Sequence, residues 1–300
     1  MLNRNVSIGV VIPYCNDIEY IEECLTSIDA QTVLADIHVY LVDDASHDSR
    51  VLSSLLSVLE FQKISVTYVR NEERMGGGES RNIGIRLSED DYIAFMDADD
   101  FWLNKKLEIQ LDKYKEGSVL STRTYKGASL KQAVQLPRRV KESKESVSEA
   151  LFCANKLLQT STFFMSANVA KNIMFNPQLP RHQDYDFLLR AEHNGNPVIQ
   201  IDQALSFWRV VDSSTSRFLK KNANAEFFIN WYLEYHKFMS TKARVAYCSK
   251  NIFSACFVTK EIGLYIKFLI ELDDSLHFKF KVMLGILTWR FTKLWRKLFL

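Results

Sequence analysis

The 300-residue sequence contains no uninterrupted apolar stretch of the roughly 18–20 residues that a membrane-spanning helix needs. It also has no large excess of either charge: 38 Lys and Arg face 36 Asp and Glu, a net charge of +2. This balance argues against general attraction to the phosphates of nucleic acid. We therefore expect no nucleic-acid partner.

Cysteine is scarce and scattered. None of the five cysteines forms the CxxC spacing of a zinc or redox site, so free thiols in a reducing compartment are expected. The first apolar run stops at Pro13 and has no small-residue cleavage site, which is unlike a signal peptide. These features together predict a cytoplasmic protein.

Strand and helix patterns alternate through the first hundred residues. Strands are predicted over 6–12, 38–42, 66–69 and 92–96, and helices over 18–28 (with Asp17 as its cap), 49–59 and 78–87. Later patterns predict strands at 119–123, 162–165 and 198–201, helices near 107–114 and over 184–193, and only helix after residue 216. Strands separated by helices favour an α/β fold with a mainly parallel sheet.

Polar residues follow the carboxyl ends of the first four predicted strands. They are Asn16, Asp43, Asp44, Asn71, Asp97, Asp99 and Asp100. Ligands of parallel sheets bind beyond these ends, so the polar residues mark the expected binding edge.

The segment Asp97-Ala98-Asp99-Asp100 can be interpreted in two ways. Two carboxylates one residue apart at a strand end can bind one hard cation, Mg²⁺ or Mn²⁺, together with diphosphate oxygens. Acidic residues also cap helices, and this is the alternative for Asp100 in particular.

Four ordered motifs, VVIPYCN, LVDDAS, GGGESRNIGI and DADD, resemble glycosyltransferase family 2. The resemblance covers residues 6 to about 216 and implies the GT-A fold, a mainly parallel sheet flanked by helices. Residues 1–216 would form this domain, with the donor half at about 1–103 and the acceptor half at about 104–216. Residues 217–300 would form a helical extension ending in a basic amphipathic helix.

The resemblance also implies roles in binding a nucleotide-sugar donor. Pro13 and Tyr14 would line the base and ribose, and Asp44 would accept a hydrogen bond from the nucleobase with Asp43 beside it. Arg81 would support the nucleotide site, the alternative being an ion pair on a helix surface.

A divalent cation, Mn²⁺ or Mg²⁺, is the implied cofactor. Asp99 would bind it directly, and Asp97 would approach both the ribose and the metal. The charge count agrees, since several carboxylates facing a diphosphate need a cation between them.

Asp184 matches the acidic residue that precedes a helix in this family, and it would serve as the catalytic base. Inverting transfer needs a base that takes the acceptor proton on the face opposite the leaving group. The alternative is a cap of the following helix.

The chain departs from the family after its last predicted strand. Many relatives have Tyr-Arg-x-His there, whereas this chain has Trp208-Arg209-Val210-Val211 and lacks the histidine. Arg209 could still contact the diphosphate. Asp212 or water are the open alternatives for the missing ligand.

Apolar residues recur at helical spacing through 279–300, where basic residues are frequent and no acid occurs after Asp274. This pattern fits a helix in the headgroup region of an anionic membrane. It also fits a helix packed on the protein's own core.

Together these features predict transfer of a single sugar from a nucleotide-diphosphate sugar, UDP by family frequency, to a hydroxyl of a glycan or lipid-linked acceptor. Inversion is expected, at the inner face of the cytoplasmic membrane, in lipopolysaccharide or capsule synthesis by analogy with the family. A retaining transferase and an inactive, membrane-attached interaction protein are the alternatives.

Overall fold

The computed structural model describes residues 6–210 and 224–299. Contacts divide the chain into two compact units, residues 1–144 with 156–213, and residues 145–155 with 214–300. The predicted domain boundary at residue 216 lies outside the described residues.

The first unit is built around one sheet with helices on its faces. Its strands are β1 (Ser7–Tyr14), β2 (Asp36–Asp43), β3 (Ile64–Arg70), β4 (Tyr92–Phe95), β5 (Phe101–Trp102), β6 (Val119–Gly127), β7 (Val134–Leu136), β8 (Phe164–Ser166) and β9 (Val198–Arg209). Its helices are α1 (Ile21–Asp29), α2 (Ser49–Val58), α3 (Gly77–Leu87), α4 (Lys106–Lys113), α6 (Ala167–Ile173) and α7 (Gln183–His193). These bounds confirm the predicted alternation of strands and helices.

The sheet has the order β3-β2-β1-β4-β8-β6-β9-β5, with β7 paired to β6. The first four strands are mutually parallel, as helical crossovers require. β8 then runs antiparallel to both β4 and β6. The donor half is thus a parallel sheet, and the later strands extend it with mixed direction.

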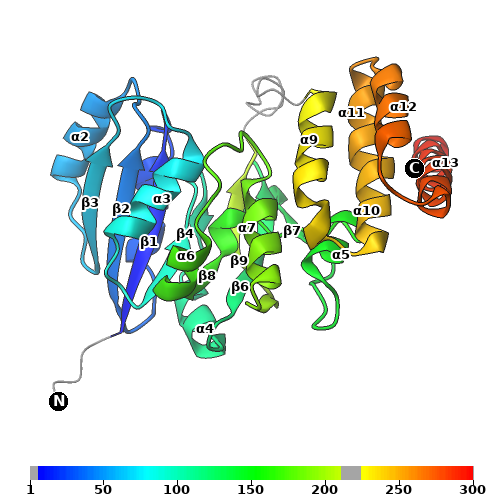
Figure 1. Cartoon of the computed structure of the whole chain (residues 1–300). Coiled ribbons are helices and arrows are strands. Elements are labelled where there is room, and N and C mark those ends of the chain that lie inside the picture. The colour runs from blue at the N-terminus through cyan, green and yellow to red at the C-terminus, as the bar shows by residue number, and fades with distance from the viewer. Residues whose placement is uncertain (1–5, 211–223, 300) are drawn as a thin grey trace. The chain divides into compact units, whose positions relative to one another are not determined.

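Strand β1 lies in the centre of this sheet and is buried on both faces. Its alternate residues Ile8, Val10 and Ile12 share an apolar cluster with buried residues of α1 and α2. On the other face Val11 meets α3 at Gly84, where an added Cβ would stand 2.4 Å from the Val11 Cγ1 atom. Figure 1 shows α3, α6 and α7 gathered on one face of the sheet. The close fit at Gly84 fixes how α3 is placed.

The predicted capping role of Asp17 is wrong. Helix α1 begins at Ile21, follows Tyr20, and has no side-chain cap. The backbone carbonyl of Asp17 instead accepts hydrogen bonds from the Tyr20 and Ile21 N–H groups at 3.0 and 3.2 Å, which forms a turn before the helix. The sequence pattern located the helix but began it too early. Ile18 lies in this turn three residues before Ile21, so it fits the helical spacing although it is not in the helix.

The second unit is helical where it is described. It contains α5 (Val147–Phe152), α9 (Ala225–Tyr235), α10 (Thr241–Tyr247), a π-helical turn (Cys248–Ile252), α11 (Phe253–Val258), α12 (Ile262–Glu271) and α13 (Leu276–Phe299). Its core is aromatic: Trp231 and Phe152 both pack against Tyr247, with ring centroids 5.0 and 4.9 Å away. No helix in the described part of the chain is long and apolar enough to cross a membrane.

Candidate active site

The carboxyl ends of β1, β2 and β4 meet at one edge of the sheet. Strand register pairs Tyr14 with Asp43, and the Asp44 N–H donates to the Tyr14 carbonyl at 2.9 Å. The Met96 N–H donates to the Val11 carbonyl at 3.1 Å, so the chain that carries Asp97 leaves the sheet beside β1. The structure therefore brings the predicted donor motifs to a common edge.

Asp44 fastens the glycine-rich loop that precedes α3. Its two carboxylate oxygens accept hydrogen bonds from the backbone N–H groups of Met75 (2.7 Å) and Gly76 (2.9 Å), and the Asn71 amide donates to one of them at 3.1 Å. Gly76 has φ +85°, a conformation that glycine adopts readily. This carboxylate thus shapes the loop at the predicted nucleobase position, a role that the sequence did not indicate.

Tyr14 and Asp43 have no exposed surface. The Tyr14 hydroxyl donates to Asp48 at 2.7 Å, and burial together with this bond raises the Tyr14 pKa. The Asp43 carboxylate accepts from the Tyr68 hydroxyl at 2.8 Å and from the Ser46 N–H at 2.8 Å. The buried side chains of Tyr14 and Asp43 therefore stabilise the binding edge of the sheet from inside the protein. Pro13 is half-buried and lies nearer to the surface.

Asp97 and Asp99 are both partly exposed, whereas Ala98 and Asp100 are buried. The Asp100 carboxylate accepts hydrogen bonds from the Ser161 hydroxyl and the Gln159 amide, each at 2.6 Å, and from the Arg209 N–H at 3.1 Å. Burial, with the charges of Asp99 and Asp97, raises the Asp100 pKa well above its usual value. The capping interpretation of Asp100 is wrong, since the next helix, α4, begins only at Lys106.

The anchors of Asp100 were not predicted from sequence. Ser161 lies in a short 3₁₀ turn before β8 and Gln159 directly precedes that turn, both far from Asp100 along the chain. Ser161 also accepts a hydrogen bond from the Asp97 N–H at 3.0 Å. The sequence indicated only that Gln159 and Ser161 come just before a predicted strand, which does not point to a contact with Asp100.

Arg81 is buried, with 8% of its surface exposed, so the alternative of an ion pair on a helix surface is wrong. Its Nη2 atom lies 2.5 Å from the Asp97 carboxylate. Its Nη1 atom donates to the Gln183 side-chain oxygen at 2.9 Å, and its guanidinium lies over the Phe175 ring. Arg81 therefore joins the acidic segment after β4 to the start of α7.

Asp184 is the second residue of α7, and its Oδ1 atom accepts from the Tyr185 N–H at 2.9 Å. The residue at the capping position is His182, so Asp184 lies within the first turn and does not cap the helix. Burial raises the Asp184 pKa to about 6; the negative charge of Asp97 acts in the same direction, whereas backbone hydrogen bonds and the charge of Arg81 oppose the rise. A carboxylate of this pKa is ionised near neutral pH and basic enough to accept a proton.

Arg209 ends β9 beside the acidic segment. Its backbone N–H binds the Asp100 carboxylate, and its Nε atom donates to the Asp99 carbonyl at 3.0 Å. Its guanidinium pairs with Glu23 and lies 4.8 Å from the Tyr20 ring centroid. The structure thus places Arg209 at the site, while Val211 and Asp212 lie outside the described residues.

The two partly exposed carboxylates suit a hard divalent cation chemically. Asp97 and Asp99 offer the oxygen atoms that Mg²⁺ and Mn²⁺ prefer. Among the described residues, no group of three or more His, Cys, Asp or Glu is placed to hold a metal. A cation held by Asp97 and Asp99 would therefore need further ligands from a diphosphate or water.

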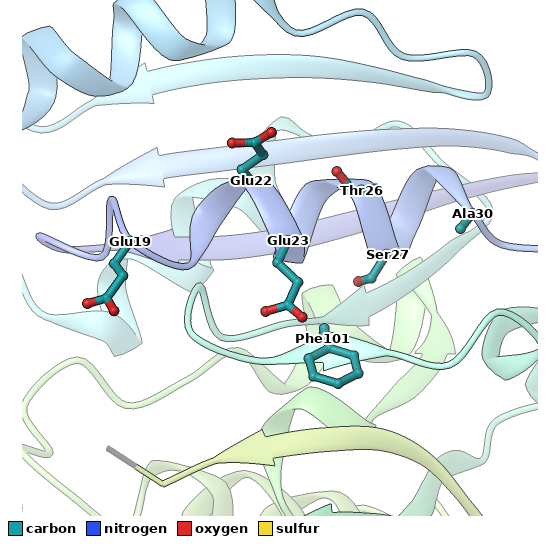
Figure 2. Close-up of a pocket in the computed structure, with 7 residues that line it drawn as sticks. All are labelled: Glu19, Glu22, Glu23, Thr26, Ser27, Ala30 and Phe101. Atoms are coloured by element: carbon teal, nitrogen blue, oxygen red, sulfur yellow. The ribbon is translucent and has the colours of Figure 1, made fainter. Parts of the chain in front are cut away.

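A shallow groove of about 490 Å³ runs along α1. Figure 2 shows the Glu19 and Glu23 carboxylates on the side of α1 that faces Phe101, while Glu22 points away. Because its charged lining residues are carboxylates, the groove is unsuited to a diphosphate. Glu23 belongs both to this groove and to the ion pair with Arg209.

Sequence comparison gives a family match that covers more than half of the chain. A model described as Glycosyl transferase family 2 matches residues 9–172. The chain is also 29% identical to "Amylovoran biosynthesis glycosyltransferase AmsB" of Erwinia amylovora over 235 residues, which are 76% of this chain and 77% of that protein.

Solved structures share the fold at low sequence identity. TarS residues 1–349 of S. aureus, solved with UDP, match with a TM-score of 0.58 at 20% identity, over 88% of this chain and 79% of that one. This chain spans only 39% of a longer TarS chain. The mannosyltransferase PcManGT of Pyrobaculum calidifontis, solved with GDP-Man and Mn²⁺, matches with a TM-score of 0.59 at 14% identity, over 95% and 80%.

Proposed function

The chain belongs to glycosyl transferase family 2 and is a glycosyltransferase with the GT-A fold. We propose that it transfers one sugar from a nucleotide-diphosphate sugar to an acceptor hydroxyl with inversion. A UDP-sugar is the favoured donor, since TarS was solved with UDP. Mn²⁺ or Mg²⁺ is the proposed cofactor.

One observation carries this proposal: Arg81 links the Asp97 carboxylate to the first turn of α7, which bears Asp184. Asp97, Arg81 and Gln183 therefore form one connected group of side chains, which ends at the residue directly before the candidate base. A protein that had lost catalysis would be expected to have lost part of this group. The connected group thus favours the enzyme over the inactive interaction protein.

In the proposed mechanism Asp184 removes the proton from the acceptor hydroxyl as that oxygen attacks the anomeric carbon. The bond to the diphosphate breaks on the opposite face, so the sugar is inverted. Arg81 and Arg209 would bind the nucleotide and its phosphates, and Asp97 with Asp99 would hold the cation. A bound divalent cation neutralises the charge that develops on the departing diphosphate. A retaining reaction is the alternative, in which Asp184 would not act as the base.

The proposed acceptor is a growing glycan or a lipid-linked saccharide of a bacterial surface polysaccharide, such as lipopolysaccharide or capsule. Support comes from AmsB, whose name assigns it to amylovoran biosynthesis. We propose that the protein acts in the cytoplasm, at the inner face of the membrane.

Helix α13 supports this membrane location, because it has two apolar faces. Phe278 and Val282 are buried in the second unit, and Gly285 lies against Ser249. The exposed apolar residues Leu276, Phe280, Met283, Leu284 and Leu287 recur at helical spacing on a different face. Lys279 and Lys281 are near them in the sequence, and no acid follows Asp274. An exposed apolar stripe with basic residues fits an anionic membrane surface.

The membrane proposal is tested by co-sedimentation with phosphatidylglycerol and phosphatidylcholine vesicles. We expect binding to the anionic vesicles only, and its loss in Phe280→Asp/Leu284→Asp. Leu34→Asp, which changes an exposed leucine of the first unit, should bind like the wild type. Equal binding by all three proteins would contradict the role of α13.

The donor proposal is tested by thermal stabilisation with UDP, GDP, dTDP and CMP, each with and without Mn²⁺. A ligand at a hundred times its Kd stabilises the folded state by about 2.7 kcal/mol, which is readily measured. We expect stabilisation by one diphosphate that requires Mn²⁺ and disappears in Asp99→Ala. If no nucleotide stabilises the wild type, the donor-binding proposal fails and the interaction protein becomes the better explanation.

A further inference from the structure

The side chain of Gln183 is held at both ends of its amide group. Its Nε2 atom donates to the Leu179 carbonyl at 2.7 Å, and its Oε1 atom accepts from Arg81 Nη1 at 2.9 Å. Gln183 is the first residue of α7 and directly precedes Asp184. These two bonds therefore fix the helix turn that carries the candidate base.

Arg81 transmits this constraint to the donor carboxylates. Its Nη2 atom contacts Asp97 at 2.5 Å, while its Nη1 atom donates both to Gln183 and to the Gly77 carbonyl. Since the guanidinium is planar and buried, its two ends cannot move independently. A displacement of Gln183 would therefore also displace Asp97.

Glycine at the start of α3 makes this arrangement fit. A Cβ on Gly78 would stand 3.2 Å from the Asn176 carbonyl oxygen and 3.4 Å from Gln183 Nε2. A Cβ on Gly77 would stand 3.3 Å from Arg81 Nη1. The glycine run thus lets α3 approach the segment that leads into α7.

A neutral amide at position 183 suits the contact with Arg81 better than a carboxylate would. It accepts from Arg81 without cancelling the guanidinium charge, so Asp97 is the only carboxylate that pairs with Arg81 among the ion pairs described. A carboxylate at position 183 would compete with Asp97 for that charge. It would also face the Leu179 carbonyl with no hydrogen to donate.

We propose that Gln183 is a positioning residue that, through Arg81, holds Asp184 in a fixed place relative to the donor carboxylate Asp97. This inference rests on the proposed transferase function. It adds that the identity of residue 183 sets the geometry between base and donor.

The test compares Gln183→Met, Gln183→Glu and the control Gln178→Met, which changes an exposed glutamine of the same segment. Each protein is first shown to be folded by its urea midpoint. We expect Gln183→Met to lower kcat by about ten- to a hundred-fold with the donor KM changed less than about threefold, because it removes the bond between residue 183 and Arg81 but keeps the pair between Arg81 and Asp97. Gln183→Glu should lower kcat and also raise the donor KM, because it draws Arg81 away from Asp97. The control should match the wild type in both constants.

Hydrogen exchange supplies a readout that needs no catalysis. In Gln183→Met the N–H of Asp186, which binds the His182 carbonyl at 2.9 Å, should exchange about tenfold faster or more than in Gln178→Met. Unchanged kcat and unchanged exchange in Gln183→Met would overturn the proposal. If the wild type neither binds nucleotide nor transfers sugar, the proposed function fails, while the exchange comparison still decides whether Gln183 fixes the helix start.

Discussion

The Asp100 carboxylate accepts a hydrogen bond from the Ser161 hydroxyl at 2.6 Å, in a place where both side chains are almost completely buried. This bond ties the turn after β4 to the turn before β8. The buried Asp100 therefore anchors the segment 97–100 to the protein interior, while Asp97 and Asp99 remain partly exposed.

Asp100→Ala should destabilise the protein by about 1–3 kcal/mol, because it leaves the buried donors of Ser161 and Gln159 without this acceptor. Urea unfolding measures the change. The control Asp112→Ala, at an exposed position of α4, should be neutral within about 0.5 kcal/mol. Equal midpoints for the two variants would contradict the anchoring role of Asp100.

Asp184→Asn should abolish transfer and yet stabilise the protein at pH 8. The folded state raises the Asp184 pKa from 3.8 to about 6, so it binds a proton more tightly than the unfolded state does. The free energy of unfolding therefore falls as the pH rises from about 4 to about 6, by at most about 3 kcal/mol for a shift of this size, and stays lower above pH 6. The gain in Asp184→Asn should be largest above pH 6 and should vanish below about pH 4, as thermal unfolding across this range would show.

In the wild type the same group should set the acidic limb of the kcat/KM profile, which reports groups of the free enzyme. Activity should fall as the pH drops through about 6, because a protonated base cannot accept the acceptor proton. A profile that stays flat down to pH 4.5 would remove Asp184 from the role of base.

Gly84→Ala should destabilise the fold by about 1–3 kcal/mol, since its Cβ would stand 2.4 Å from Val11 Cγ1. The double variant Gly84→Ala/Val11→Ala should recover part of this loss, because it removes the atoms in collision. Gly263→Ala, on helix α12 with no atom within 4 Å of its added Cβ, is the matched control and should cause no loss. A non-additive recovery in this double-mutant comparison would establish the contact.

Arg190→Met should be among the most damaging changes in the first unit. It leaves the Asp186 carboxylate buried without the guanidinium that contacts it at 2.6 and 2.7 Å, at an expected cost of about 3–5 kcal/mol. Arg123→Met breaks an ion pair with the exposed Asp202. The loss of this pair should lower the free energy of unfolding by less than the loss of the Arg190–Asp186 pair does. Chemical denaturation of both variants gives the comparison.

The parallel part of the fold could be predicted because each strand is a short, buried, β-branched run between turn residues. Strand β1 illustrates this: its apolar residues serve both faces of the sheet, and the pattern alone located it to within two residues at each end. The GT-A fold and the family are confirmed by the comparisons.

The supports of the site could not be predicted in the same way. Gln159 and Ser161 reach Asp100 across about sixty positions of the chain, and no local pattern encodes such a contact. For the same reason no local pattern indicated that Asp44 binds the Met75 and Gly76 N–H groups. Motifs indicate which residues carry chemistry, whereas long-range hydrogen bonds decide how those residues are held.

The structural role of Asp44 limits how its expected contact with the nucleobase could be re-engineered. An attempt to alter nucleotide preference by replacing Asp44 would also release the loop that leads into α3, because its carboxylate oxygens hold that loop. Loss of binding in such a variant would therefore say little about base recognition. Directed evolution toward another nucleotide should leave Asp44 in place and vary the exposed side chains of Arg74 and Met75, which can change without undoing the loop.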